Sequence, residues 1–488
     1  MNETAPPALR GVAVPLPRRV PGRVKLAFGF GATAFGIKDN GFSLLLLIYY
    51  NQVIGVPAAV VGTAVLIALV LDAFVDPVVG HLSDNLRTRW GRRHPFLYAS
   101  AIPAGLFFLL LWNPPEASNT GMFFYILGIA FLVRATMSCF EVPMAALGPE
   151  LTSDYHERTR IFGLRFFFGW LGGAAMLLFT FAVLLAPTPD YPDGQLNPQG
   201  YRDYAIIASV IMSSVILISA LGTHSEIKFL PKTERLHLTL SQTFRGIFHS
   251  LGNRAFLILM LAGFCANVSQ GISFGLLTYF LTYFWELGSI ALAWYTFGLM
   301  VGIGGAVIGS SMVSRQIGKR RAAQWFLIGA ILILPIPYIG RILGLFPDNG
   351  DPMLLPSIIA FIAIGTGSHV AALILKSSML ADVIEDDAER TGTRSEGLFF
   401  AGQFFIQKCV SGAGVFISAA ILTIVAFPEP ATPGEVAQGI LQNLALIYIG
   451  LIVMLGIVAA AIMQRFPIEQ SDHEARIARM RGTTDPFE

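Results

Sequence analysis

The chain has 488 residues, of which 54% are hydrophobic and only 13% are charged. A mean hydropathy of +0.64 is too high for a water-soluble fold of this length, so the composition excludes that class and predicts a polytopic membrane protein. The formal net charge of +2 indicates no particular partner, and no nucleic acid.

Apolar stretches that reach or exceed the ~20 residues needed for a membrane helix recur along the whole chain. We predict an all-α fold of twelve transmembrane helices, with spans at 27–52, 58–82, 95–114, 121–147, 161–186, 203–223, 253–284, 288–312, 323–346, 353–381, 396–427 and 438–463. Lys and Arg gather in the two tails and in alternate loops, while the other loops contain only Arg202 and Arg341. By the positive-inside rule, both termini are predicted to be cytoplasmic.

Two glycine-rich basic segments, six predicted spans apart, indicate an internal duplication. One runs from Gly80 to His94 and the other from Gly309 to Arg321. We therefore expect a cytoplasmic basic tail at 1–24, an N-terminal six-helix bundle at 25–224, a cytoplasmic linker at 225–252, a C-terminal six-helix bundle at 253–463 and a second cytoplasmic tail at 464–488. The first tail has no apolar core, so it is not predicted to be a cleaved signal peptide.

Charged residues inside the predicted spans carry the strongest indication of function. A lone charge at mid-bilayer costs roughly 3 kcal/mol, so such residues usually face a bundle interior and mark an ion or substrate path. Five basic residues lie in otherwise apolar stretches and are expected to face four buried acids; the basic residues are Lys38, Arg134, Arg165, Lys376 and Lys408, and the acids are Asp39, Asp72, Asp76 and Glu141. The pattern predicts a transporter.

Three of these acids predict a site for a small cation. Asp72 and Asp76 lie one turn apart on the second span, and like charges so placed destabilise a helix unless a cation or a basic residue lies between them. Glu141 adds a third carboxylate, and Ser138, one turn before it, adds a hydroxyl oxygen. Such a cage of hard oxygens suits Na⁺, the only metal ion we expect, or it holds a proton on one of the crowded carboxyl groups.

The two glycine-rich loops resemble the signature loop of the major facilitator superfamily, in both form and position. The resemblance covers nearly the whole chain and implies two pseudo-symmetric six-helix bundles. It also implies that Asp84, Arg92 and Arg93 are gate residues that latch neighbouring helices on the cytoplasmic side. The alternative is a solvated charge cluster that only fixes the orientation in the membrane.

A closer resemblance rests on four motifs, which are Asp72-x-x-x-Asp76-Pro, Arg89-Trp-Gly-Arg-Arg-x-Pro, Pro143-x-x-Ala-Leu-x-Pro-Glu-Leu-Thr and Gln407-Lys-Cys-Val-Ser-Gly. Together they are similar to the glycoside, pentoside and hexuronide cation symporters, which include the sodium-coupled melibiose permeases. That resemblance implies a cation site made of Asp72, Asp76, Glu141 and Ser138, with Lys408 as the neighbouring counter-charge. In the alternative, Asp72, Asp76 and Lys408 form a buried ion pair that holds the halves together.

The resemblance is weaker at the expected sugar site. Arg165 matches the arginine that grips sugar in the melibiose permeases, but the positions of the two stacking tryptophans fall on Ala145 and Leu373. The residues expected to bind the solute are Asp39, Arg165, Lys38, Arg134 and Lys376. So many basic groups also suit an acidic sugar such as a hexuronide, or an anionic head group, and each can instead neutralise a buried acid. His369 is interpreted as a hydrogen-bonded core residue.

The sequence thus predicts a monomeric symporter of the bacterial inner membrane that moves a sugar or glycoside with Na⁺ or H⁺ by alternating access. We expect membrane lipid around it and no cofactor. An enzyme is not predicted, because the chain lacks the pattern of a nucleophile triad, a metal-ligand cluster or a phosphate loop. Two alternatives are a cation-coupled transporter of lysolipids or other amphiphiles, which resemblance to the same branch allows, and a membrane sensor that does not transport.

Overall fold

The computed structural model describes residues 19–152, 155–230, 252–391 and 396–467. Within these ranges the regular structure is helical, and a single β-bridge joins Thr88 to Gly91 in a loop. Ten helices of the described part are long and apolar enough to cross a membrane. The broken first span and α15 add two more, which is consistent with the twelve predicted spans. Most of the predicted tails and linker lies outside the described residues.

The first half of the chain begins with a broken helix. Between Gly22 and Val53 five short segments follow one another, and two of them are π-helical, a wide turn that is frequent at functional sites. The bounds of this half are α1 Gly22–Phe30, α2 Thr33–Asn40, η1 Gly41–Leu45, α3 Leu46–Ile48, η2 Tyr49–Val53, α4 Ala58–Asn85, α5 His94–Leu111, α6 Asn119–Leu151, α7 Tyr155–Phe179, η3 Thr180–Leu184, η4 Gly194–Leu196, α8 Pro198–His224 and η5 Ile227–Phe229.

The second half contains longer and less broken helices. One span is divided into α12 and α13 around Pro335, because proline cannot donate the backbone hydrogen bond that a continuous helix requires. The bounds are α10 Arg254–Tyr279, η6 Phe280–Phe284, α11 Ser289–Ile317, α12 Lys319–Ile333, α13 Ile336–Ile342, α14 Leu354–Thr391, α15 Glu396–Ile424 and α16 Gln438–Gln464. α14 continues well past the predicted span at 353–381, since its polar end extends the helix beyond the apolar stretch.

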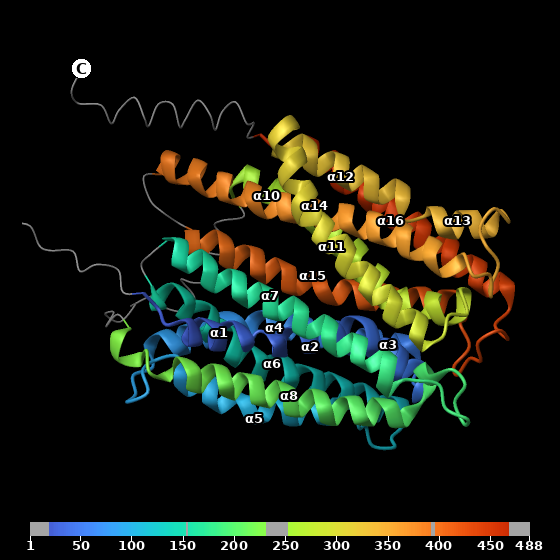
Figure 1. Ribbon diagram of the computed structural model, residues 1–488, viewed down its shortest axis with the longest axis horizontal. Helices are drawn as coiled ribbons and strands as arrows, with labels where there is room; N and C mark the ends of the chain where they lie inside the picture. Colours follow the sequence, from blue (N-terminus) through green and yellow to red (C-terminus); the bar gives the residue numbers. More distant parts are fainter. Residues whose placement is uncertain (1–18, 153–154, 231–251, 392–395, 468–488) are drawn as a thin grey trace, which may run out of the picture.

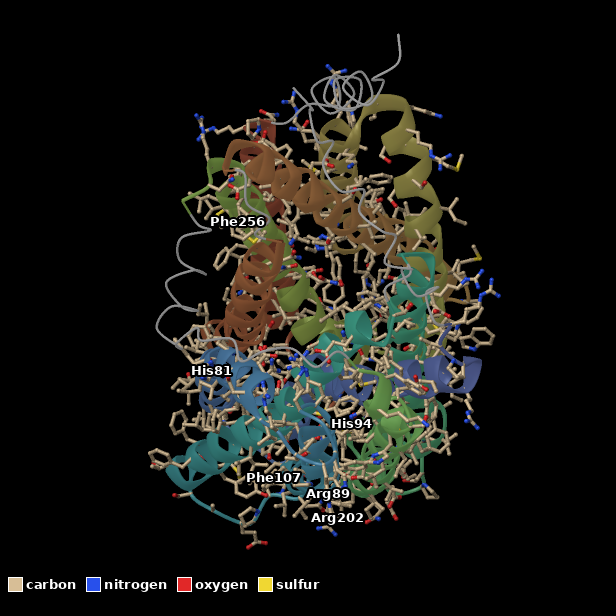
Figure 2. The ribbon with its side chains drawn as sticks, turned by 90° about the vertical axis from the view of Figure 1, so that its left-hand side faces the viewer. His81, Arg89, His94, Phe107, Arg202 and Phe256 are labelled. Carbon is tan, nitrogen blue, oxygen red and sulfur yellow. The ribbon has the colours of Figure 1, made fainter. Side chains whose placement is uncertain are left out.

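The helices form two groups, α1 to α8 and α10 to α16 (Figure 1). The groups meet along α4 with α15 and along α7 with α11. Seen end-on they are two bundles, with His94 in the lower and Phe256 in the upper one (Figure 2). Successive spans run in opposite directions, so α1 begins and α16 ends at one end of the molecule, here called the base. The opposite end, where Ile54 and Trp285 lie, is called the tip.

The first spans of the two halves end at the tip in the same backbone pattern. In each span, one backbone amide donates a hydrogen bond to the carbonyl five residues earlier. The amide two residues later donates to the carbonyl six residues before it. The four bonds are Ile54 to Tyr49 at 3.0 Å, Val56 to Tyr50 at 2.8 Å, Trp285 to Phe280 at 2.9 Å and Leu287 to Leu281 at 2.8 Å, each from N–H to carbonyl oxygen. This shared ending supports the internal duplication that the basic loops predicted.

Glycines bring the helices of each half into backbone contact. A Cβ atom added at Gly36 of α2 would lie 2.0 Å from the carbonyl oxygen of Gly169 in α7, so no larger residue fits there. In the second half, a Cβ atom at Gly414 of α15 would lie 2.4 Å from the Cα atom of Gly271 in α10. Small residues at membrane helix contacts allow this close packing. The Gly36 contact fixes the part of α2 that carries Lys38.

Gln52 joins the two halves at the tip. Its side-chain oxygen accepts hydrogen bonds from the Ala431 amide at 2.9 Å and from the Tyr283 hydroxyl at 3.1 Å. Its amide nitrogen donates to the Pro428 carbonyl at 3.1 Å. The side chain is buried, so each of these groups would lose its partner in a place without water if Gln52 were removed.

A second polar bridge at the tip runs through Gln195, which lies in η4 between α7 and α8. Its amide donates to the Leu287 carbonyl at 2.9 Å, and its oxygen accepts from the Thr282 hydroxyl. Between the two bridges, the Tyr279 hydroxyl donates to Asn51 at 2.8 Å. Neutral hydrogen bonds therefore fasten the two halves together at the tip.

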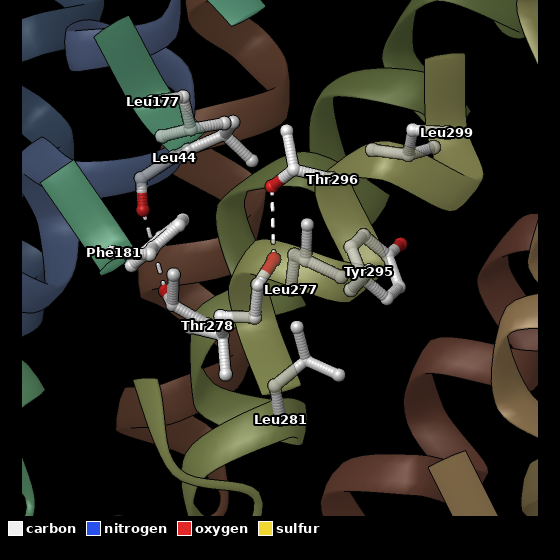
Figure 3. A pocket seen from close by; sticks show the side chains of 10 residues that line it. Leu44, Leu177, Phe181, Leu277, Thr278, Leu281, Tyr295, Thr296 and Leu299 are labelled. Carbon is white, nitrogen blue, oxygen red and sulfur yellow. Dashed lines mark hydrogen bonds between the residues drawn. The ribbon is translucent and has the colours of Figure 1, made fainter. Parts of the chain in front are cut away.

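A small apolar cavity lies beside this closure, on the seam between the halves (Figure 3). Leu44, Leu177 and Phe181 line it from the first half, and Thr296 lies among the residues that line it from the second. The Thr296 hydroxyl bonds within its own helix, to the Leu292 carbonyl at 2.9 Å. A substitution at Thr296 therefore reports on the seam without removing a contact between the halves.

We expect Gln52→Leu to loosen the tip, because the apolar side chain leaves buried donors and acceptors of the second half unpaired at about 1–3 kcal/mol each. The measurement uses Thr296→Cys in a background without the three native cysteines. Labelling of this thiol from the tip side by a membrane-impermeant maleimide should become about fivefold faster or more.

Gln199→Leu is the matched control, since the Gln199 amide bonds only within α8, to Asp203 at 3.0 Å. It should leave the labelling rate unchanged. Equal labelling rates for Gln52→Leu and the parent protein would show that the glutamine does not hold the tip closed.

Candidate functional site

Among the described residues of the first half, Asp72 is the most deeply buried acid or base that carries a charge. It lies in α4 with 1% of its surface exposed, and it accepts a hydrogen bond at 2.9 Å from the Arg134 guanidinium of α6, which is 7% exposed. The Ser138 hydroxyl, one turn along α6, donates to the other carboxylate oxygen at 3.0 Å. The guanidinium carbon of Arg134 also lies 5.6 Å from the ring centre of Phe42. Asp72 therefore has a cationic partner supplied by the chain itself.

Glu141 has a different basic partner. Lys38 of α2, only 4% exposed, places its Nζ atom 3.3 Å from a carboxylate oxygen of Glu141. The same ammonium lies 4.5 Å from the ring centre of Phe35, one turn earlier on α2. Arg165 of α7 is within electrostatic reach of Glu141. The resulting cluster of one acid and two bases joins α2, α6 and α7.

The acids of the predicted cation cage are thus distributed over two clusters. Ser138 donates a hydrogen bond to Asp72, as expected, whereas Glu141 forms an ion pair with Lys38. Asp76 lies half-buried one turn after Asp72 in α4. The side chain of Lys408, the predicted counter-charge, lies outside the described residues. A cation site that uses all the predicted acids at once therefore requires Arg134 or Lys38 to move.

Two residues of the predicted solute site are paired with acids. Arg134 and Lys38 were expected to contact the solute or to neutralise a buried acid, and in this structure they neutralise Asp72 and Glu141. The physical reason is that a charge in the membrane core is stabilised by an opposite charge at hydrogen-bond distance. Sequence spacing could not identify these partners, because each pair joins two separate spans.

Asp39 differs from the expectation that it is buried, since its side chain is exposed. It follows Lys38 directly on α2, and successive helical residues point about 100° apart, so the two side chains cannot share one environment. Phe35, one turn earlier, is exposed as well. These two side chains and the half-buried Arg165 are the parts of the predicted solute site in the first half that a ligand can reach.

The predicted gate residues come together at the base. Arg93 contacts Asp84 at 2.5 Å and Glu150 at 2.9 Å, and Arg92 contacts Glu150 at 2.7 Å. The Arg93 guanidinium also donates to the Ser83 hydroxyl at 2.6 Å. These bonds tie the end of α4 and the loop after it to the end of α6, all within the first half. Glu150 lies at the centre of this cluster. The sequence showed it only as one residue of the motif that begins at Pro143.

The second half repeats this arrangement in simpler form. Lys319, at the start of α12, contacts Asp382 of α14 at 2.7 Å. Lys319 directly follows the second glycine of its segment, Gly318, as Arg92 follows Gly91. Asp382 lies on the fourth span of its half, as Glu150 does. The ion pairs described at the base thus join helices of the same half, whereas the hydrogen bonds at the tip join the two halves.

Glu157 of α7 fixes the chain at the entry to α1. Its carboxylate accepts from Lys25 at 2.8 Å, from the Val20 amide at 3.1 Å and from the Thr152 hydroxyl at 3.2 Å. Burial raises the pKa of Glu157, but the hydrogen bonds and the positive charge of Lys25 outweigh it and hold the pKa below its usual value. The residue is therefore structural, and it remains ionised at neutral pH.

Lys376 and His369 lie in the second half, two turns apart on α14. Lys376 is 8% exposed and His369 is 7% exposed. The lysine lies directly against α10, where a Cβ atom added at Gly263 would come within 2.6 Å of its Nζ atom. Nε2 of His369 finds no hydrogen-bond partner among the described residues. The interpretation of His369 as a hydrogen-bonded core residue therefore stays a prediction.

Comparison with known proteins gives a consistent result. The family model described as MFS/sugar transport protein matches residues 27–470. The chain is 26% identical to a putative glycoside/cation symporter of Escherichia coli, over 82% of each chain, and 26% identical to a glucuronide carrier protein homolog of the same organism, over 88% of this chain and 90% of the other. Its fold is similar to that of a solved bacterial homologue of the lysosomal transporter Spinster, with a TM-score of 0.65 and 16% identity, over 91% of this chain and 97% of the other.

We expect Arg134→Met to destabilise the protein strongly, because it leaves the Asp72 carboxylate buried without its charged partner, at a cost of about 3–5 kcal/mol. Adding Asp72→Asn removes the orphaned charge, so the double variant should regain most of the loss. Thermal unfolding of the purified variants in detergent measures both effects.

Arg202→Met, at an exposed arginine near the tip, is the control and should unfold like the parent protein. If the double variant unfolds at the same temperature as Arg134→Met alone, the instability does not come from an unpaired Asp72.

Proposed function

Because the chain belongs to the MFS/sugar transport protein family, and within it to the glycoside, pentoside and hexuronide symporters, we propose that it carries a sugar or glycoside together with Na⁺ or H⁺ by alternating access. The observation that carries the proposal is the buried cluster of Asp72, Arg134 and Ser138. In the membrane core the Asp72 carboxylate is neutralised by Arg134 of the chain itself, and a mobile cation can compete with Arg134 for this carboxylate.

The proposed coupling step is an exchange of partners at Asp72. When Na⁺ or H⁺ neutralises this carboxylate, Arg134 no longer has an acid to hold it and can turn away. The Ser138 hydroxyl and the Asp76 carboxylate then supply further oxygens to the bound cation, with Lys408 as the proposed counter-charge. By linkage, any solute that prefers the released form of Arg134 tightens cation binding by the same factor.

The proposed solute site lies next to this cluster. Asp39 and Phe35 present an acid and an aromatic ring on exposed positions of α2, and Arg165 offers a planar set of donors from α7. Lys38 and Glu141 connect the two clusters, because Lys38 shares its helix with Asp39 and Glu141 shares its helix with Arg134. We propose that the two clusters are coupled through α6, which carries both Arg134 and Glu141.

The conformation follows from the predicted orientation. If the termini are cytoplasmic, the tip faces outward and the glutamine bridges close the outer end. Transport then requires the tip to open and the base to close, and the proposed gate residues Asp84, Arg92 and Arg93 would exchange contacts within the first half for contacts with the second. The protein would lie in the inner membrane of a bacterium, as a monomer.

One observation favours a second function. The small cavity on the seam between α7 and α11 is lined mainly by leucines and by Phe181, so a wider opening of the seam would suit an alkyl chain better than a sugar (Figure 3). A cation-coupled transporter of lysolipids or other amphiphiles would use such a seam as a side entrance. Uptake of a panel of labelled glycosides and lysolipids into proteoliposomes, with Na⁺ and pH gradients imposed separately, distinguishes the two functions and identifies the coupling ion.

We expect Asp76→Asn to abolish accumulation of the solute against its gradient, because the amide cannot compensate the charge of a bound cation. Exchange of labelled for unlabelled solute across the membrane should persist. The control is Asp203→Asn, at a carboxylate that bonds to Gln199 near the tip. Accumulation by Asp76→Asn at the level of the parent protein would remove Asp76 from the proposed cation site.

Arg165→Lys should weaken solute affinity about tenfold or more, because lysine keeps the charge but loses the paired donors of the guanidinium. The measurement is the concentration of solute that gives half-maximal uptake. A change of less than about twofold would place the solute elsewhere.

A further inference from the structure

Charge is distributed unevenly between the two halves of the membrane-embedded region. The acids in the middle of the spans, Asp39, Asp72, Asp76 and Glu141, all belong to the first half. In the second half α10, α11, α12 and α16 contain no Asp or Glu at all, and the acids of α14 begin only at Asp382, near the base. Lys376 and Lys408 therefore lie inside spans whose acids stand only at the ends, from Asp382 onward in α14 and at Glu396 in α15.

Lys376 also differs from the other embedded basic residues in its contacts. Lys38 and Arg134 each hold a carboxylate, and Arg165 is within reach of Glu141. Among the residues whose side chains the structure describes, no carboxylate contacts Lys376. Its ammonium instead lies against Gly263, where the missing side chain of glycine leaves the space that the ammonium occupies.

The face of α10 that packs against Lys376 carries two polar side chains. Asn267 and Gln270 follow Gly263 by one and two turns, so all three lie on the same side of the helix. α10 and α14 are the first and fourth spans of their half and run in opposite directions. Gln270 therefore lies at the depth of His369, as Gly263 lies at the depth of Lys376.

These four side chains combine burial with access. Lys376 and His369 are buried, whereas Asn267 and Gln270 are half-buried, so a ligand can approach along α10. Nε2 of His369 is buried and unpaired within the described residues, and neither amide has a described hydrogen bond. The arrangement offers one full positive charge and several neutral donors, which is the chemistry that recognises an oxyanion.

From this arrangement we propose that Lys376 and His369 on α14, with Asn267 and Gln270 on α10, bind the carboxylate or sulfonate group of an acidic solute. The proposal rests on the proposed transport function and specifies its substrate class, since a neutral glycoside would leave the charge of Lys376 without a counter-charge. The hydroxyl groups of the same solute would contact Arg165 and Asp39 in the first half. The solute then bridges the halves and provides the negative charge that the second half lacks.

The test compares two solutes that differ only at the acidic group, methyl β-glucuronide and methyl β-glucoside. Competition against labelled glucuronide is measured with the full-length protein in vesicles of phosphatidylcholine, which carries no net charge. The parent protein should prefer the glucuronide about tenfold or more, since each lost charge-assisted contact costs roughly that factor. Lys376→Gln should abolish this preference, because it lowers the affinity for the glucuronide far more than the affinity for the glucoside, and His369→Asn should reduce the preference.

Arg341→Gln is the control, because Arg341 is an arginine of the second half that bonds to Asp348 outside the spans. It should keep the parent preference. Equal affinity for both solutes, with no effect of Lys376→Gln, would overturn the oxyanion site and leave glycoside transport standing. If phosphatidylglycerol added to the vesicles competes with the glucuronide, the site belongs to a lipid head group and the proposal is wrong.

Absence of transport for both solutes would contradict the proposed function, and direct binding then decides the inference. Glucuronate should raise the unfolding temperature of the purified parent protein and not that of Lys376→Gln, or of Asn267→Ala if the lysine variant fails to fold. No shift with the parent protein, or the same shift with each variant, would overturn the oxyanion site.

Discussion

A charge in the membrane core has to find an opposite charge, because neither lipid nor packed side chains solvate it. The structure meets this constraint mainly through α6. Arg134 and Glu141 lie seven residues apart on this helix, hence on one face, and they have opposite signs. Arg134 reaches Asp72 on α4 and Glu141 reaches Lys38 on α2. α6 thus supplies the base of its buried ion pair with α4 and the acid of its buried ion pair with α2. The proposed cation and solute sites depend on this arrangement.

The duplication preserved the scaffold of the two halves more closely than their chemistry. The wide turns that end the first span of each half at the tip match bond for bond, and in each half a similar ion pair joins helices at the base. The central charges do not match, since the second half has basic residues and no acids in the middle of its spans. In the proposed mechanism the first half accordingly handles the cation, and the second half contributes positive charge.

The two ends of the molecule are held by different kinds of bond. At the tip the halves meet through neutral hydrogen bonds of Gln52 and Gln195, and at the base the described ion pairs remain within each half. Water can replace the neutral bonds at small net cost, whereas separating a buried charge from its partner costs several kcal/mol. A rocking motion can therefore open the tip at small cost, with α4 against α15 and α7 against α11 as the contacts that must slide.

Local properties of the sequence determined the architecture. Hydrophobic stretches of spanning length predict the helices, and the repeated loops from Gly80 and Gly309 predict the duplication, because both signals lie within short segments. The partners of the buried charges depended on the tertiary structure. Spacing along one helix placed Ser138 near Glu141, but the hydrogen bond from Ser138 to Asp72 depends on the packing of α4 against α6. The same holds for Lys376, whose isolation from acids follows partly from the sequence, while its place against Gly263 is decided by the contact of α14 with α10. Contacts between helices that are distant in sequence have no periodicity to reveal them, so the pairing of charges becomes visible only in the folded chain.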